Sequence, residues 1–577
     1  MTTPQRYRFL PEPRGQWTVE TDLRGHDLCV EPLLNRGSAF TAQQRREFGL
    51  EGLLPGGEST IDRQAARVHE QIVSKGSPFE QYLELAALQD RNEVLFFRVM
   101  AEHLEQFLPI IYTPTVAEAT RRFSENFRRG RGLYLNPDLK GRFSEAMRAV
   151  VGGRDIRMIV ATDNEAILGI GDQGVGGMAI PVGKLAIYTL AAGIHPSQVL
   201  PVCLDVGTDN HKLRADSRYL GANIPRLRGA AYREFIEEFV GAVRAHCPNA
   251  ILQWEDFRKD LALEVLERYR EVLPSFNDDI QGTGAIALAG MMSATRVLDQ
   301  PLSSHRIVVY GAGAAGTGIT RQLRSALQSA GLDAQRAHHA VAVLDSRGLL
   351  VKGGGGDPYK ESLGWDRAEA GRVGLASEHP VQLLQLVERW KPTALIGTSG
   401  VFGSFDENIV RAMLRGGAQR PIIFALSNPD TNSEATPAEL LAWTQGRGLI
   451  ATGSPFPPTT VNGAVHHTAQ GNNALVFPGI GLGALVSRAR RVSVGMITAA
   501  ANALAAQVTP AELAEGQLLP GITRLPEVSV AVAAAVARTA IEEGLAAEGF
   551  SIAAIGAAID RQRWTPQYPL IVPLRTR

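Results

Sequence analysis

The sequence predicts an α/β protein with two successive strand-and-helix regions, and three patterns in the chain support that prediction. Short apolar runs alternate with helical segments from about residue 157, a glycine-rich turn joins a strand to a helix near residue 311, and helical stretches flank both regions. Alternating strands and helices are typical of a largely parallel sheet with helices on its faces. With 577 residues, the chain is long enough for several domains of about 150 residues each.

The composition is that of an ordinary globular protein. Hydrophobic residues make up 45% of the chain, charged residues 20%, and the formal net charge is zero, so we expect no nucleic-acid partner. Cys29, Cys203 and Cys247 show neither paired nor metal-type spacing, which is typical of reduced thiols in a cytoplasmic protein. The N-terminus lacks the apolar core of a secretory signal, and no uncharged apolar run reaches the ~18 residues of a membrane span, so we expect no membrane partner.

Residues 1–155 are expected to form a helical region. The stretch "FEQYLELAALQDRNEVLFFRVMAEHLEQFL" spaces its apolar residues at helical intervals over several turns. Residues 156–278 differ, because they hold short apolar runs that end in polar or glycine clusters and that we interpret as strands of an α/β domain. These runs are "RMIVATD", "AILGIGDQG", "VLPVCLDVGTDN", "AILQWEDF" and "LPSFNDDIQG".

Carboxylates follow these expected strands. Ligands of a parallel sheet bind beyond the carboxyl ends of its strands, so side chains in these places are candidates for a site. The carboxylates at these ends are Asp163, Asp172, Asp205, Glu255, Asp256, Asp278 and Asp279.

Residues 279–490 are expected to form a second α/β domain, of the Rossmann type. In "HRIVVYGAGAAGTGITRQLRSAL", the residues Gly311, Gly313 and Gly316 form a GxGxxG pattern between a strand and a helix, and Ala314 lies inside it. The first glycine allows a tight turn, the second lets a pyrophosphate approach the backbone, and the helix N-terminus then faces the phosphate charge. The alternative is a glycine turn that only packs a helix on a strand.

The next expected strand, "HAVAVLDSRG", ends in Asp345, which suits the 2′-hydroxyl of a ribose and slightly favours NAD. Ser346, Arg347 and Lys360 follow closely and could instead hold the 2′-phosphate of NADP, so both cofactors stay open. Further strands are expected in "TALIGTSG", "PIIFALSNPD" and "GLIATGSPF", and residues 491–577 are expected to form a helical C-terminal region.

One lysine and three carboxylates have the chemistry of a catalytic site. Lys184 lies in the otherwise uncharged stretch "GMAIPVGKLAIYTLAAG"; burial lowers the pKa of a lysine and makes it a usable base, although a lysine that extends to solvent along an apolar surface would fit as well. Glu255, Asp256 and Asp279 offer an all-oxygen site for Mg²⁺ or Mn²⁺. The alternative for these carboxylates is helix capping at solvated strand ends.

Over nearly its whole length, the chain resembles the malic enzymes of the large type. The resemblance is specific because many long stretches match in one order: "NRGSAFTAQQRREFGLEGLLP", "LQDRNEVLFFRVM", "PIIYTPTVAEA", "ILGIGDQGVGGMAIPVGKLAIYTLAAGI", "LPVCLDVGTDN", "WEDF", "FNDDIQGTG", "PIIFALSNP", "GSPFPP" and "QGNNALVFPG". The family's N-terminal catalytic module would span about residues 80–270, and its NAD(P)-binding module would run on to about residue 535.

The resemblance implies the oxidative decarboxylation of L-malate to pyruvate and CO₂, with reduction of NAD or NADP, by a homodimer or homotetramer. It assigns Lys184 as the general base and Tyr112, in "IYTPTV", as the proton donor. It assigns Asp278 to meet Lys184. The remaining implied residues are the metal ligands Glu255, Asp256 and Asp279, and the cofactor- and substrate-side residues Asn428, Asn472 and Asn473.

The chain departs from the family pattern at Ala166, where the family has an arginine that pairs with a substrate carboxylate. Either a neighbouring arginine, with Arg154 and Arg157 as candidates, takes its place, or the substrate differs, or malate binding in this chain is impaired. Two alternatives to a malic enzyme therefore stay open. One is a related metal- and NAD(P)-dependent 2-hydroxyacid decarboxylating dehydrogenase, and the other is a non-enzymatic nucleotide-binding regulator.

Overall fold

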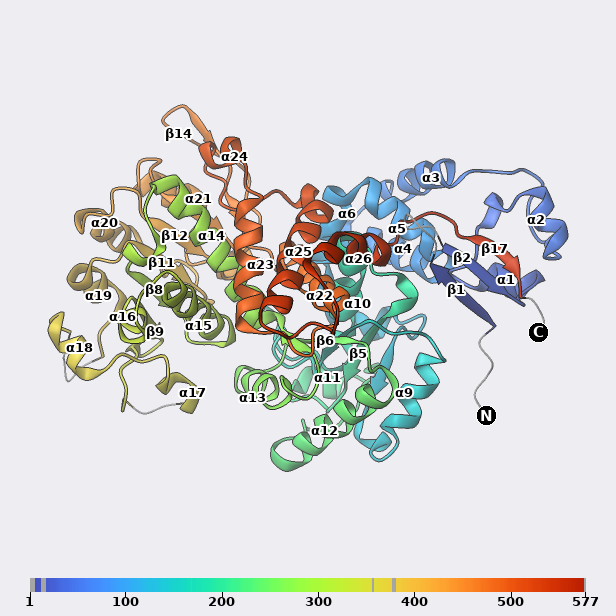
Figure 1. Ribbon diagram of the computed structural model, residues 1–577, viewed down its shortest axis with the longest axis horizontal. Helices are drawn as coiled ribbons and strands as arrows, with labels where there is room; N and C mark the ends of the chain where they lie inside the picture. Colours follow the sequence, from blue (N-terminus) through green and yellow to red (C-terminus); the bar gives the residue numbers. More distant parts are fainter. Residues whose placement is uncertain (1–5, 12–16, 168, 355–356, 376–379, 575–577) are drawn as a thin grey trace. The chain divides into compact units, whose positions relative to one another are not determined.

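The chain is divided between two units (Figure 1) in a computed structural model that describes residues 6–11, 17–167, 169–354, 357–375 and 380–574. The first unit consists of Met1–Glu255, Leu485–Arg488 and Ala547–Arg577. The second consists of Asp256–Ala484 and Ala489–Ala546. The C-terminal segment thus returns to the unit that contains the N-terminus.

The N-terminal part of the first unit is mainly helical, as the spacing of its apolar residues predicts. The helix that begins at Pro78 is capped by Ser77, whose hydroxyl accepts a hydrogen bond from the N–H of Glu80. A core that includes Phe96, Phe97 and Phe107 fills the space between these helices. They are α1 (Gly25–Val30), α2 (Ala42–Glu47), α3 (Ile61–Val73), α4 (Pro78–Arg91), α5 (Glu93–Glu102), α6 (Leu104–Ile111), α7 (Thr115–Arg121), α8 (Phe123–Asn126) and α9 (Phe143–Val151).

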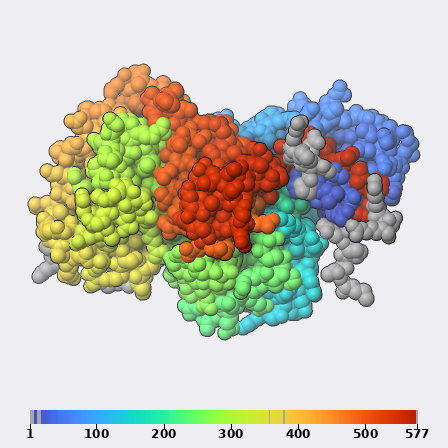
Figure 2. Space-filling model, viewed as in Figure 1, coloured from blue at the N-terminus to red at the C-terminus, as the bar shows by residue number. Residues whose placement is uncertain are grey.

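The same region also contains strands that its local pattern does not indicate. Strand β2 (Trp17–Thr21) pairs antiparallel with β1 (Tyr7–Pro11) and parallel with β17 (Leu570–Pro573) (Figure 1). In the space-filling view, C-terminal residues (red) lie beside N-terminal residues (blue) (Figure 2). The C-terminal Trp564 is buried in the same core as Trp17. Helical spacing within one segment carries no information about a partner at the other end of the chain, which is why the sequence analysis did not predict this sheet.

A parallel sheet forms the centre of the first unit. Its strands lie in the order β3 (Leu133–Leu135), β5 (Val199–Leu204), β4 (Met158–Thr162) and β6 (Ile251–Glu255). Every residue of β4 is buried, as expected for a strand covered on both faces. The expected strand "AILGIGDQG" is wrong: Gly169 and Gly171 have φ of 78° and 68°, and the chain turns there. Helix α10 (Ala179–Ile187) packs against β4 and β5, and α12 (Gly229–His246) contacts β6 through Phe239 and Trp254, whereas α11 (His211–Ala215) buries none of its residues.

Helix α10 belongs to the one helical run among the described residues that has the length and composition of a membrane span. This run, Gly174–Ala192, includes a 3₁₀ turn before α10 and a π-helical turn after it. Within the structure 89% of it is buried, and α10 packs against β4 and β5. It is therefore a core helix of the first unit.

The second unit is built on a seven-stranded sheet in the order β10-β9-β8-β11-β12-β13-β16. All neighbouring strands are parallel except β10, which pairs antiparallel with β9. The strand order reverses between β8 and β11, which marks the ligand-binding crevice of this type of sheet. The strands are β8 (Ile307–Tyr310), β9 (Val341–Asp345), β10 (Gly348–Leu349), β11 (Ala394–Gly397), β12 (Ile422–Ala425), β13 (Leu449–Thr452) and β16 (Ala469–Gln470).

All five strands expected here from the sequence are present, as β8, β9, β11, β12 and β13. The remaining helices and strands follow in chain order; α26 belongs to the C-terminal segment of the first unit. The helices are α13 (Lys259–Tyr269), α14 (Thr283–Leu298), α15 (Ala314–Ser329), α16 (Ala334–His339), α17 (Pro358–Glu361), α18 (Arg367–Arg372), α19 (Leu383–Trp390), α20 (Glu407–Arg415), α21 (Pro437–Trp443), α22 (Phe477–Ser487), α23 (Val494–Ala506), α24 (Pro510–Ala514), α25 (Leu525–Glu542) and α26 (Ile555–Gln562); the strands are β7 (Ser275–Asn277), β14 (Thr459–Val461) and β15 (Ala464–His466).

Candidate functional site

The glycine turn between β8 and α15 has the geometry that the sequence predicts. Gly311 has a φ of 121°, a conformation that favours glycine. A Cβ atom on Gly316 would lie 1.7 Å from the carbonyl oxygen of Gly311, so the helix can approach the turn only with glycine there. Gly313 is the N-cap of α15, and Ala314 is its first residue. The unpaired N–H groups of this helix N-terminus can therefore face an anion such as a pyrophosphate.

Asp345 ends β9, where a Rossmann-type sheet binds the adenosine ribose. Its carboxylate accepts hydrogen bonds from Lys360 Nζ at 2.6 Å and from the N–H of Arg347 at 2.8 Å. Burial raises the pKa of Asp345, but the bonds from Lys360 and Arg347 outweigh burial and hold the pKa below its ordinary value. The carboxylate is thus ionised and able to accept a ribose hydroxyl, while two cationic groups lie beside it.

Three carboxylates come together at the end of β6. Glu255, Asp256 and Asp279 each offer one oxygen, and these oxygens lie within 4.8 Å of one another. The N–H of Asp256 donates to Asp279 Oδ2 at 2.9 Å. Successive side chains of a regular strand point to opposite faces of the sheet. Asp256 departs from the strand conformation, with a left-handed backbone and a φ of 57°, and its carboxylate can therefore point to the same place as that of Glu255. Three convergent carboxylate oxygens suit Mg²⁺ or Mn²⁺.

Lys184 lies on α10 with 3% of its surface exposed, so it does not extend to solvent. Its Nζ is 2.6 Å from Glu255 Oε1 and 5.9 Å from the centre of the Tyr112 ring. Tyr112 is the C-cap residue directly after α6, and it is buried as well. The structure therefore brings together three residues that the sequence analysis assigned to a base, an acid and a metal ligand.

A chain of hydrogen bonds fixes the position of Glu255. Its Oε2 accepts from Gln253 Nε2 at 2.9 Å, and Gln253 Oε1 in turn accepts from the hydroxyl of Tyr188 at 2.5 Å. Tyr188 follows directly after α10. The segment that carries Lys184 therefore also orients the carboxylate that the lysine pairs with.

Asp278 and the asparagines near it have different roles in the structure. Asp278 is fully buried, and its Oδ2 accepts from Asn473 Nδ2 at 3.1 Å. Asn472 uses its side chain to accept from the N–H of Ala474 at 2.9 Å. Asn428 lies in the loop after β12. The pairing of Asp278 with Lys184 stays a prediction.

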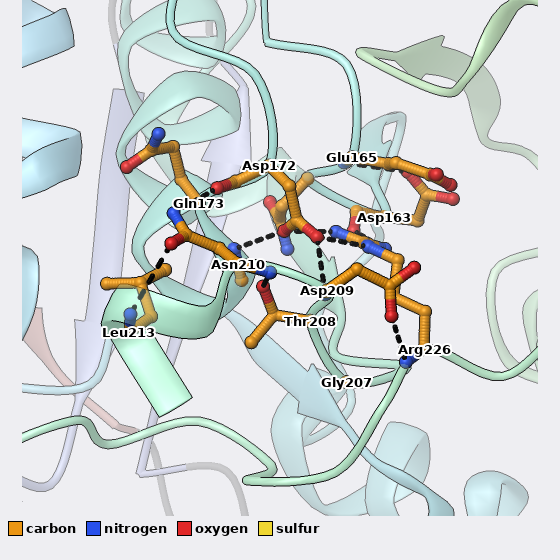
Figure 3. Close-up of polar contacts among 12 residues, drawn as sticks. Asp163, Glu165, Asp172, Gln173, Gly207, Thr208, Asp209, Asn210, Leu213 and Arg226 are labelled. Atoms are coloured by element: carbon orange, nitrogen blue, oxygen red, sulfur yellow. Dashed lines mark hydrogen bonds and ion pairs between the residues drawn. The ribbon is translucent and has the colours of Figure 1, made fainter. Parts of the chain in front are cut away.

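A charged network surrounds the loop that holds Ala166 (Figure 3). Arg226 is buried and donates to both carboxylate oxygens of Asp172 at 2.8 Å, and to the carbonyl of Asp163 at 2.8 Å. Burial raises the pKa of Asp163 to about 6. Asp172 is also partly buried, but the bonds from Arg226 outweigh that effect and hold its pKa below the ordinary value. Arg226 therefore fixes the two ends of the loop to each other.

Ala166 itself is exposed, and the prediction that Arg154 or Arg157 replaces the family arginine is wrong. Both arginines precede β4, whereas Ala166 follows it, and a strand of this length spans about 16 Å. Arg154 donates to the carbonyl of Val151, and the other arginine pairs with an aspartate beside it.

A second guanidinium beside this loop, next to the neighbour of Ala166, belongs to Arg228, and the sequence analysis missed both arginines. Arg228 pairs with Glu165, the neighbour of Ala166, at 2.7 Å, and with Asp209 at 2.6 Å. The signal in the sequence that could have indicated this network is the pair of arginines in "IPRLRG", which begins about 14 residues after the aspartate-containing stretch "LPVCLDVGTDN".

The fold and the glycine turn define a dinucleotide-binding α/β protein, here with a buried lysine and a group of carboxylates. The chain belongs to the malic enzyme family: the model described as "Malic enzyme, N-terminal domain" matches residues 89–270, and "Malic enzyme, NAD binding domain" matches residues 280–541.

Relatives and solved structures agree with this assignment. An NAD-dependent malic enzyme 3 of Bacillus subtilis (strain 168) is 44% identical, over 96% of this chain and 98% of that protein. An NAD-dependent malic enzyme of Pseudomonas aeruginosa (strain UCBPP-PA14) is 42% identical, over 94% and 96%. The crystal structure of Entamoeba histolytica malic enzyme has the same fold, with a TM-score of 0.55 and 21% identity, over 89% of this chain and 91% of that one.

Replacing Arg226 with methionine should destabilise the first unit by about 3–5 kcal/mol, because Asp163 and Asp172 would lose their buried cation. Denaturation with urea measures the loss. The matched control is Arg228→Met, which removes a half-exposed pair worth only about 0–1 kcal/mol. Equal losses in the two variants would contradict the assignment of Arg226 as the buried cation of the network.

The loss in Arg226→Met should also depend on pH. Asp163 has a raised pKa, and without Arg226 it takes up a proton still more readily, so the penalty for its unpaired charge disappears as the pH falls. Asp172 stabilises the wild-type fold only while ionised, and this contribution is lost as the pH falls through its lowered pKa. Both effects reduce the difference in the free energy of unfolding between Arg226→Met and wild type as the pH falls from about 7 to about 5 and below.

Proposed function

We propose that the chain catalyses the oxidative decarboxylation of L-malate to pyruvate and CO₂, with NAD as the hydride acceptor and Mg²⁺ or Mn²⁺ as a required cation. The observation that carries the proposal is the buried Lys184, whose Nζ lies 2.6 Å from Glu255, a member of the three-carboxylate group. Relatives named as NAD-dependent malic enzymes, 44% and 42% identical, support NAD over NADP.

In this proposal Lys184 is the general base and takes the proton of the malate hydroxyl while hydride leaves the adjacent carbon for the nicotinamide. Its amine must be neutral to accept that proton, so the ammonium form that pairs with Glu255 has to lose a proton before the reaction. Glu255, Asp256 and Asp279 would hold the cation, which when bound polarises the substrate oxygen and stabilises the negative charge that develops there. Tyr112 then donates its hydroxyl proton to the carbon that has lost CO₂.

Asp278 and Asn473 would fix the substrate side of the site. Asn473 Nδ2 donates to Asp278 and also to the hydroxyl of Thr283 at 3.1 Å, so its carbonyl oxygen has a defined direction. Asn428 would lie near the nicotinamide and the substrate, because the loop after β12 stands at the carboxyl edge of the sheet. Asn472 would act through the turn that it caps.

A second candidate function is a decarboxylating dehydrogenase for another 2-hydroxy acid. The observation that favours it is Ala166, which leaves the loop after β4 without the family's guanidinium. A non-enzymatic nucleotide-binding regulator fits less well, since Tyr112, Lys184 and the three carboxylates are all retained.

The assembly and compartment follow from the family and from the thiols. We propose a homodimer or homotetramer, as the resemblance to the large malic enzymes implies. A cytoplasmic location is supported by the three cysteines, which are all free.

The function is tested with a panel of 2-hydroxy acids, with NAD or NADP, in the presence of Mn²⁺ or of excess EDTA. L-malate with NAD and Mn²⁺ should give the highest kcat/KM, and EDTA should abolish turnover, because the negative charge that develops on the substrate would lack its cation. Glu255→Gln should weaken Mn²⁺ binding in a direct titration. Full turnover in EDTA would exclude the metal assignment, and a better substrate than malate would favour the second candidate.

Variants of Lys184 and Tyr112 should separate the steps of the reaction. Lys184→Arg keeps a cation beside Glu255 but cannot act as a base, so malate oxidation should be lost as in Lys184→Ala. Tyr112→Phe should still decarboxylate oxaloacetate but protonate the product about 10²–10⁴-fold more slowly, whereas the control Tyr7→Phe should match wild type. Wild-type turnover in Tyr112→Phe would show that another group is the acid.

Ala166→Arg should lower the KM for malate by about ten-fold, because an added guanidinium can bind a substrate carboxylate through two hydrogen bonds. Ala166→Lys is the matched control, since it adds the charge without the planar fork and should gain less. An unchanged KM in Ala166→Arg would indicate that another residue, with Arg228 as the first candidate, already binds the carboxylate.

A further inference from the structure

Glu434 is a fully buried carboxylate in the second unit, and the described residues give it no ion pair. An ionised group without water or a counter-charge is costly unless hydrogen bonds replace both. Glu434 meets that requirement with donors only. Its Oε1 accepts from the N–H of Ser399 at 2.7 Å, from the hydroxyl of Ser399 at 2.9 Å and from the hydroxyl of Ser427 at 2.5 Å, and its Oε2 accepts from the N–H of Ser427 at 3.3 Å.

These donors belong to two different loops. Ser399 follows β11, and Ser427 follows β12, its neighbour in the sheet. The Ser427 hydroxyl also accepts from the N–H of Gly400 at 2.9 Å, so it connects the loops in both directions. The backbone carbonyl of Glu434 accepts from the N–H of Phe405 at 2.9 Å, which fixes the far end of the first loop.

The last residue of β11, just before the first loop, leaves space for the same carboxylate. A Cβ atom on Gly397, the last residue of β11, would lie 2.6 Å from the carboxyl carbon of Glu434. The next residue, Thr398, donates its hydroxyl to the carbonyl of Gly311 at 3.3 Å, in the glycine turn. Hydrogen bonds thus connect the Glu434 carboxylate to the loops after β11 and β12, and Thr398 connects the first of these loops to the glycine turn after β8.

The loops after β11 and β12 lie where the nicotinamide half of a dinucleotide would bind. The strand order reverses between β8 and β11, and a dinucleotide lies across that point. In this type of sheet the adenosine ribose binds at the acid that ends the second strand, here Asp345 after β9, and the pyrophosphate binds at the glycine turn after β8. The nicotinamide half therefore lies over the loops after β11 and β12, the second of which contains Asn428.

We propose that Glu434 is a positioning residue for the nicotinamide half of the cofactor, acting through the loops that contain Ser399 and Ser427. The inference rests on the proposed use of NAD. A carboxylate is required because Oε1 accepts three hydrogen bonds and Oε2 accepts a fourth, whereas a glutamine would direct its NH₂ group at one of these donors. Loss of the carboxylate would release both loops without touching the adenosine side.

The test compares the binding of NAD⁺ and of AMP, measured by calorimetric titration without malate. Glu434→Gln should weaken NAD⁺ binding by about ten-fold or more, because charge-assisted hydrogen bonds that hold the loops are lost. AMP, which lacks the nicotinamide half, should bind with an unchanged Kd. The matched control is Glu439→Gln, which removes a capping interaction with Thr436 in the next helix and should change neither Kd.

A milder variant keeps the inference testable if Glu434→Gln does not fold. Ser427→Ala removes the hydroxyl that joins Gly400 to Glu434, and it should weaken NAD⁺ binding by about three-fold or more while AMP binding is unchanged. Equal losses for NAD⁺ and AMP, or none for either, would overturn the positioning role. If the wild-type protein binds NAD⁺ but does not oxidise malate, the proposed function fails. The difference between NAD⁺ and AMP binding in the variants still decides the role of Glu434.

Discussion

A buried ammonium group needs an anion beside it, and the first unit is organised around that requirement at Lys184. The anion is Glu255, at the end of β6, and the lysine comes from α10, which packs on the neighbouring strands of the same sheet. The residue that follows α10, Tyr188, holds the glutamine that orients Glu255. The position of the helix, the end of the strand and the direction of the carboxylate are therefore one coupled arrangement, in which a change at any member moves the others.

Buried and partly buried carboxylates are stabilised in two different ways in this chain. In the first unit, Asp172 is paired with a guanidinium, which adds charge balance and a bidentate geometry. In the second unit, Glu434 has only hydroxyl and N–H donors, so its charge is solvated by the loops themselves. The first arrangement makes a loop rigid by connecting its ends. The second makes two loops depend on one side chain, and so gives one residue control over a whole edge of the sheet.

The sequence was most informative where a local pattern has a single physical cause. The glycine turn after β8, the acid at the end of β9 and the strands between them were all predicted, because each depends on residues close in the chain. The gathering of Tyr112, Lys184 and Glu255 was expected only through the resemblance, since no spacing connects residues from three elements. Arg154 and Arg157 were the wrong candidates near Ala166 because proximity in sequence was taken for proximity in space. Glu434 was missed because a glutamate between a proline-containing loop and a helix resembles an ordinary solvated residue.

The pairing of β2 with β17 has a consequence for the synthesis of the protein. Strand β2 is translated about 550 residues before its parallel partner β17. Until then, one edge of β2 has no partner, and the core beside it lacks Trp564. An unpaired strand edge is a template for association with other chains. The nascent protein must therefore keep this sheet unfinished, or protected by other factors, while the residues between β2 and β17 are translated, and a variant without β17 would keep that edge of β2 unpaired.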